Sequence, residues 1–186
     1  MIFSKEPDMN FGNFPPLPFP AAYVGGGVIV HSEKGILTCK RHGEPWDNYT
    51  SACFGGYVEP SDSNAVATAI REVKEETGLL VKIEFLLGIY GPECLHYTFF
   101  SENGRYYAKA TKYPGHIRPV ISFVFAGRPV SGELKDSSET AGVCWKKPDD
   151  LVGENLAFFD ALLLADFLNA TPEKRDLGKQ ALKLIM

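Results

Sequence analysis

The sequence lacks three features that mark particular classes of protein. Positive charge is not in excess, since 23 Asp and Glu face 19 Lys and Arg, so nothing predicts nucleic-acid binding through phosphate neutralisation. The four cysteines include no C-x-x-C pair, which argues against a zinc ribbon. No apolar run is long enough to span a bilayer, because Asp160 and Asp166 interrupt Leu156–Leu168. We expect no nucleic-acid or membrane partner.

The N-terminus also lacks a basic start followed by an apolar run, so we expect a cytoplasmic protein with free thiols. Residues 1–22 differ from the rest in holding five prolines and four phenylalanines. The prolines exclude a helix or a central strand, whereas the phenylalanines would gain from burial. Two interpretations stay open: an extended arm packed on the domain or on a second subunit of a homodimer, and a disordered arm.

Residues 23–186 should form one domain, because 45% of the chain is hydrophobic and one core can be built from it. Strand-like segments alternate with helix-like ones. We predict strands over 25–30, 36–40, 79–90, 95–100, 105–110, 120–130 and 143–145, with helices over 63–77 and 158–168 and from 172 to about 185. This alternation predicts an α/β (α+β) fold with a mixed sheet and helices on its faces.

The helix predicted over 63–77 has an apolar side formed by Val66, Ile70, Val73 and Thr77. One of residues 61–63 is expected to cap its N-terminus, and Gly78 is suited to the position after its last turn.

Another side of this helix is acidic. At about 100° per residue, Arg71, Glu72, Glu75 and Glu76 span roughly 140° of the helix surface. Like charges three and four residues apart repel, so the helix gains nothing from them unless a cation lies between them. Oxygen ligands without a nearby Cys or His favour Mg²⁺, or Mn²⁺, over zinc. A solvated acidic surface is the alternative, and charge alone does not exclude it.

The run 71–79, Arg-Glu-Val-Lys-Glu-Glu-Thr-Gly-Leu, resembles the second half of the Nudix box, R-E-U-x-E-E-x-G-U with U aliphatic. Gly56 resembles the glycine that opens the box. The order of strands and helices over 23–168 resembles the α/β/α sandwich of that family. Two departures are evident: Arg71 follows Gly56 by fifteen residues, one more than in the pattern, and either Asp62 or Ser63 takes the place of the first glutamate.

The resemblance implies a division of roles around a divalent cation. Glu75 and Glu76 would be the main side-chain ligands, and Glu72 would share metal binding or position water. The backbone carbonyl of Gly55 or Gly56, expected in a glycine turn, would complete the site, because glycine lets the backbone approach an ion closely.

Two residues would act around that centre. Arg71 would hold a glutamate in place by a charge-assisted hydrogen bond rather than touch substrate. Glu139 resembles the loop glutamate that several members use as general base, with a solvated loop acid as the alternative.

The substrate is indicated less directly. Arg41, Glu59 and Arg118 are candidates to contact it. Pro92, fourteen residues after Gly78, resembles a proline of members that cleave ADP-ribose. We therefore expect Mg²⁺-dependent hydrolysis of a nucleoside-diphosphate compound, with ADP-ribose or a nucleotide sugar favoured. The extra residue before Arg71 keeps open a second hypothesis, a non-catalytic module of the same fold that senses a nucleotide.

Overall fold

The computed structural model describes residues 23–43, 46–91, 95–112 and 120–186. The predicted arm over 1–22 lies outside these ranges, and so do Pro92 and Arg118. Within the described part of the chain, no helix combines the length and apolar character that crossing a membrane requires.

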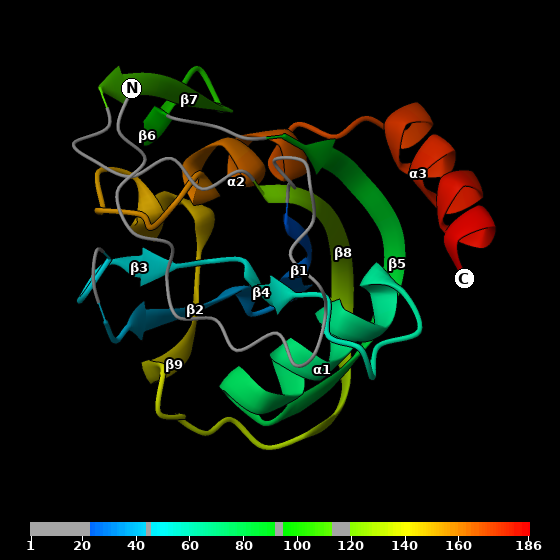
Figure 1. Ribbon diagram of the computed structural model, residues 1–186. Coiled ribbons are helices and arrows are strands. Elements are labelled where there is room, and N and C mark those ends of the chain that lie inside the picture. Colours follow the sequence, from blue (N-terminus) through cyan, green and yellow to red (C-terminus); the bar gives the residue numbers. More distant parts are fainter. Residues whose placement is uncertain (1–22, 44–45, 92–94, 113–119) are drawn as a thin grey trace, which may run out of the picture.

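A mixed sheet of seven strands forms the centre of the molecule (Figure 1). Its strands are β1 Tyr23–Ser32, β2 Gly35–Arg41, β3 Thr50–Ser51, β4 Phe54–Tyr57, β5 Leu79–Tyr90, β8 Val120–Gly132 and β9 Thr140–Lys146. The main order is β3-β2-β1-β8-β5, with β4 also paired to β1 and β9 to β2. β1 and β8 run parallel and the other pairs antiparallel, which confirms the predicted mixed sheet.

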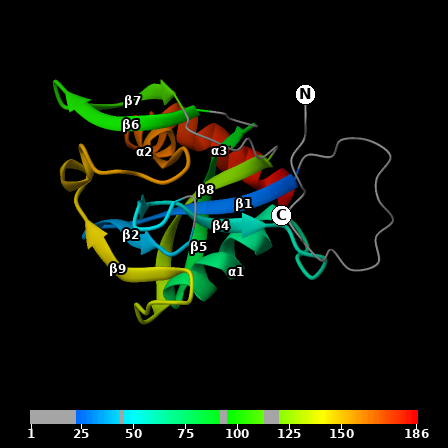
Figure 2. The ribbon, with the colours of Figure 1, turned by 60° about the vertical axis from the view of Figure 1, so that its left-hand side comes forward.

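Helices cover both faces of this sheet. They are α1 Ala65–Thr77, the 3₁₀ turn η1 Pro148–Leu151, α2 Asp160–Leu168 and α3 Pro172–Ile185. In Figure 2, α1 lies on one side of the sheet, while α2 lies on the other, between the sheet and a hairpin of β6 Leu95–Glu102 and β7 Arg105–Lys112. The predicted α/β/α arrangement is confirmed, with the hairpin as a separate two-stranded sheet.

Alternate residues of the central strands enter two different cores. Val28 and Val30 of β1 pack with α1, whereas Ile29 between them packs with α2. Phe125 of β8 likewise faces α1. Side chains of a strand point alternately to opposite faces, so a strand covered on both sides must be apolar at every position. This explains the unbroken apolar runs of β1 and β8.

The start of α1 differs from the prediction. The N-cap is Asn64, whose side chain accepts hydrogen bonds from the N–H groups of Val66 and Ala67, both at 3.0 Å. None of residues 61–63 caps the helix, and the carboxylate of Asp62 is bound elsewhere. The end of α1 is as predicted: Gly78 has a φ of 78°, in the left-handed region that glycine adopts without strain.

Other local predictions are confirmed in detail. β5 spans the predicted residues 79–90, and α3 begins at Pro172 with the Thr171 hydroxyl accepting from the N–H of Lys174. Two details were wrong. Gly55 and Gly56 lie within strand β4, paired with Gly27 and Gly26, rather than in a turn. Helix α2 begins at Asp160 rather than at 158.

Candidate functional site

Glycines bring α1 close to the sheet. A Cβ on Gly26 of β1 would lie 2.2 Å from the carbonyl oxygen of Ala65, so only glycine lets the first turn of α1 sit on this strand. A Cβ on Gly56 of β4 would lie 2.2 Å from Oε1 of Glu72. The Glu72 carboxylate is therefore packed against the Gly56 backbone, and the close approach of helix and strand places the acidic face of α1 at β4.

Glu76 is the most enclosed acid of this face. Its side chain is only 7% exposed, and its backbone carbonyl accepts a hydrogen bond of 2.7 Å from the Thr140 hydroxyl on β9. The pKa of this carboxyl is raised to about 8, chiefly by burial and also by the nearby charges of Glu72 and Glu139. The guanidinium of Arg41 and the Gly55 N–H, which donates to the carboxylate, oppose that rise without cancelling it.

Glu72 shares this environment in a weaker form. Its side chain is 16% exposed, and burial raises the pKa of the carboxyl above its usual value. Arg71 lowers this pKa, while the charges of Glu75 and Glu139 raise it. The effect of Glu139 on both Glu72 and Glu76 places this exposed loop residue within electrostatic reach of the half-buried Glu72 and the buried Glu76.

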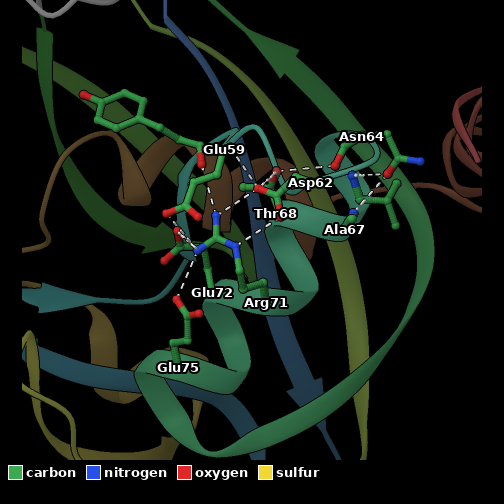
Figure 3. A network of polar contacts seen from close by, with 10 residues as sticks. Glu59, Asp62, Asn64, Ala67, Thr68, Arg71, Glu72 and Glu75 are labelled. Carbon is green, nitrogen blue, oxygen red and sulfur yellow. Dashed lines mark hydrogen bonds and ion pairs between the residues drawn. The ribbon is translucent and has the colours of Figure 1, made fainter. Parts of the chain in front are cut away.

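Arg71 gathers the surrounding carboxylates (Figure 3). Its Nε and Nη2 donate to the two carboxylate oxygens of Asp62, at 3.1 and 2.9 Å. Its Nη1 donates to Glu72 at 2.9 Å and to Glu75 at 3.1 Å, and Nη2 also donates to the carbonyl of Tyr57 at 3.2 Å. Five contacts in fixed directions use the forked geometry of guanidinium, which lysine cannot reproduce.

Asp62, and not Ser63, faces this arginine. The hydrogen bonds from Arg71 are the largest cause that lowers the Asp62 pKa to about 2. Further hydrogen bonds to this carboxylate come from the Glu59 N–H and the Thr68 hydroxyl, both at 2.9 Å. The pairing of Asp62 with Arg71 was not predicted. The sequence signals it only by a carboxylate in the loop that precedes a helix carrying an arginine.

Two predicted site residues lie at the outer edge. The side chains of Glu75 and Glu59 are each 57% exposed, and both are directed to Arg71, Glu59 at 3.8 Å. Glu75 and Glu76 are adjacent in sequence, but the 100° turn of the helix between them carries Glu76 inward and leaves Glu75 beside solvent.

Arg41 lies at the inner end of the site. Its Nη1 is 3.9 Å from Oε1 of Glu76, and its guanidinium carbon lies 4.9 Å from the centre of the Phe158 ring. Its Nε is buried and has no hydrogen-bond partner among the described residues. Sequence reasoning singled out Arg41 but missed Phe158. Arg118, the other predicted arginine, falls outside the described ranges.

Oxygen donors predominate here. Glu72 and Glu76 are four residues apart on α1 and meet the backbone of β4, with neither Cys nor His in the set. Burial raises the pKa of both carboxyls and so favours their protonated forms. A hard divalent cation bound between them would stabilise the ionised carboxylates. Within 23–43, 46–91, 95–112 and 120–186, no three acidic, His or Cys side chains are arranged so that they could hold a metal ion. The donor types fit a divalent cation, and Arg71 and Arg41 act as the counter-charges in this arrangement.

Comparison with known proteins identifies relatives. A family model described as NUDIX domain matches residues 23–167. A MutT-like protein of Streptomyces ambofaciens is 31% identical over 143 residues, which cover 77% of this chain and 74% of the relative. An ADP-ribose pyrophosphatase of Methanocaldococcus jannaschii is 35% identical over 119 residues, which cover 62% of this chain but only 55% of the relative.

The same fold is found among solved structures. The crystal structure of an ADP-ribose pyrophosphatase from Streptococcus suis matches with a TM-score of 0.57 and 21% identity, over 82% of this chain and 93% of that one. At this identity the likeness is one of fold.

Proposed function

The chain belongs to the Nudix family of pyrophosphohydrolases, and from this premise we propose that it hydrolyses the diphosphate of ADP-ribose or a nucleotide sugar with Mg²⁺. Nudix hydrolases generally use divalent metal ions. The donor atoms offered by the acidic site are carboxylate and backbone carbonyl oxygens, which favour Mg²⁺, with Mn²⁺ as a substitute. ADP-ribose is favoured because two proteins similar to this chain are named ADP-ribose pyrophosphatase.

The proposal rests on one observation: the side chains of Glu72 and Glu76 lie near the backbone of β4 with little exposure to solvent, and both have raised pKa values. Perturbed acids that gather at one place are typical of active sites. A solvated acidic helix would instead leave all three glutamates exposed, as only Glu75 is.

Glu72, Glu76 and the backbone carbonyl of Gly55 or Gly56 would hold the cation, with Glu75 as a further ligand. A bound divalent cation would neutralise charge on the diphosphate and lower the pKa of a bound water. Arg71 keeps Glu72 and Glu75 oriented through its hydrogen bonds.

Arg41 would bind the diphosphate, since its guanidinium lies beside Glu76 and its Nε lacks a partner among the described residues. Glu139 would accept the proton of the attacking water, because its charge acts on both Glu72 and Glu76. Glu59 stays a candidate for substrate contact at the exposed rim. The cytoplasmic location and the homodimer stay predictions.

The test is turnover of defined diphosphates. The full chain is incubated with ADP-ribose, nucleotide sugars and dinucleoside compounds, with and without Mg²⁺ or Mn²⁺, and the products are identified by mass spectrometry. We expect cation-dependent release of a mononucleotide, and a loss of about 100-fold or more in kcat/KM for Glu76→Gln, in line with losses at metal-site residues. Glu102→Gln, an exposed acid at the hairpin, is the matched control and should retain full activity.

A second candidate function is a non-catalytic nucleotide-binding module. The observation that favours it is the arrangement around Arg71, which binds the carboxylates of Glu72 and Glu75. Among the described residues, no three acidic, His or Cys side chains are arranged so that they could hold a metal ion. Calorimetry separates the two. Affinity for ADP-ribose that is independent of Mg²⁺, without turnover of any diphosphate, would support the module and contradict the hydrolase.

A further inference from the structure

Phe158 has a backbone conformation that its side chain disfavours. Its φ is 47°, and the other described non-glycine residues with positive φ are Asn48 and Asn103. Asparagine enters this region readily, because its short polar side chain can bond locally, whereas a bulky aromatic residue there is an outlier. Such outliers persist only when the surrounding structure holds them in place.

The chain is held on both sides of Phe158. Before it, the Ala157 N–H donates to the Thr50 carbonyl at 2.8 Å, and the Thr50 N–H donates to the Asn155 carbonyl at 2.9 Å. After it, the buried carboxylate of Asp160 accepts from the Ser51 hydroxyl at 3.0 Å and from the N–H groups of residues 52 and 53 at 2.7 and 3.3 Å. Both flanks are thus bound to β3 and the residues that follow it, and Phe158 spans the interval between them.

The ring of Phe158 is close to both Trp46 and Arg41. The Trp46 ring centre is 5.6 Å away at an interplanar angle of 53°, and Trp46 itself is buried. The guanidinium of Arg41 lies over the ring, 4.9 Å from its centre, with Nη1 3.9 Å from the Glu76 carboxylate. A guanidinium over a ring face is held by cation–π attraction, which leaves the N–H groups along its edge free for an anion.

We propose that Phe158 is a positioning residue, whose ring holds the Arg41 guanidinium beside Glu76 in the orientation that binds the substrate diphosphate. The strained backbone conformation of Phe158 places the ring against Arg41. This inference rests on the proposed function, since it names the residue through which the diphosphate-binding arginine is oriented.

Four substitutions separate this role from simple packing. Phe158→Tyr keeps the ring face and should stay within about twofold of wild-type kcat/KM. Phe158→Leu keeps apolar bulk but loses the ring, and kcat/KM should fall about 5- to 30-fold, as expected for a partly buried cation–π contact. In Phe158→Gly, kcat/KM should fall by at least as much as in Phe158→Leu. The Tm of Phe158→Gly should nevertheless exceed that of Phe158→Ala, because glycine adopts a φ of 47° without strain. Equal loss of kcat/KM in the Tyr and Leu variants would overturn the proposal.

A double-mutant cycle supplies the decisive test. In an Arg41→Ala background, Phe158→Leu should change kcat/KM less than twofold, because the ring acts only through the guanidinium. Independent, multiplying losses would overturn the proposal. If the wild-type chain cleaves no diphosphate, the proposed function fails, and the same cycle is measured as Kd for ADP-ribose. Coupling in Kd then supports the role of Phe158, and absence of coupling or of binding overturns it.

Discussion

Replacing Asp62 with asparagine removes one charge from the Arg71 network and leaves the shape of the side chain unchanged. The amide oxygen replaces only one of the two carboxylate oxygens that accept hydrogen bonds, and the amide nitrogen is a donor. The ion pair is therefore reported by the part of the stability change that depends on pH. Arg71, together with the Glu59 N–H and the Thr68 hydroxyl, lowers the Asp62 pKa from 3.8 to about 2, and one pKa unit corresponds to about 1.36 kcal/mol. The full shift would be worth about 2.5 kcal/mol at pH 7, and because the loop lies at the edge of the domain, water screens part of it, leaving about 1–2 kcal/mol.

The pH dependence of this difference has a definite sign. A carboxyl whose pKa is lowered on folding stabilises the native state above its unfolded pKa, and that contribution is lost as the pH falls through the folded value. The ion-pair part of the stability difference between wild type and Asp62→Asn should therefore be constant from pH 7 to about 5, near half its size at pH 3, and absent below about pH 2.

Urea unfolding of both proteins at pH 7, 5, 4 and 3 measures this difference. Glu102→Gln, an exposed acid at the hairpin, is the matched control and should match wild type at every pH. A difference that keeps its full size at pH 3 would refute the reasoning, because a lost ion pair cannot act on a protonated carboxyl. No difference at pH 7 would refute it equally, since the Asp62–Arg71 pair would then contribute nothing to folding.

Two further predictions concern the packed acids of α1. Gly56→Ala should lower kcat/KM at least tenfold, because the added Cβ would lie 2.2 Å from the Glu72 carboxylate and displace it. The control is Gly91→Ala, since a Cβ there would meet no atom within 4 Å. Its kcat/KM in the same turnover assay should equal that of wild type. The raised pKa of Glu76 means that the metal-free native state holds a proton which the unfolded chain has released, so the Tm in EDTA should fall as the pH rises from about 5 to 8. Glu76→Gln should flatten that slope in thermal melts, and an unchanged slope would contradict the assignment of the raised pKa to this residue.

Local patterns in the sequence were sufficient for most of the secondary structure. The alternation of β5, the turn between β6 and β7 and the Thr171-Pro172 start of α3 each depend on a few neighbouring residues, and each was found where predicted. The start of α1 was missed because several capping residues stand in a row over 61–64. Which of them caps the helix depends on where the carboxylate of Asp62 goes, and its partner Arg71 lies beyond the first turn.

The glycine pair illustrates the same limit in the sheet. Gly55-Gly56 has the composition of a turn, yet it lies in β4 because β1 offers a complementary row of glycines. Two backbones and a helix can approach so closely only where no Cβ intervenes, and that requirement involves strands about 30 residues apart. A sequence read locally does not reveal it.

The acidic face of α1 follows from the sequence alone, because the phase of a helix is set by its own 3.6-residue period. That phase places Arg71 and three glutamates on one side whatever the helix packs against. Only the tertiary structure decided which acid is buried: Glu76 is 7% exposed and its neighbour Glu75 is 57% exposed. It also brought Arg41 and Phe158 to the site from positions 35 residues before and 82 residues after Glu76. The burial of Glu76 and its contact with Arg41 depend on how β1, β4 and β9 pack against the helix. Packing between segments that are far apart in the sequence cannot be deduced from any one of them.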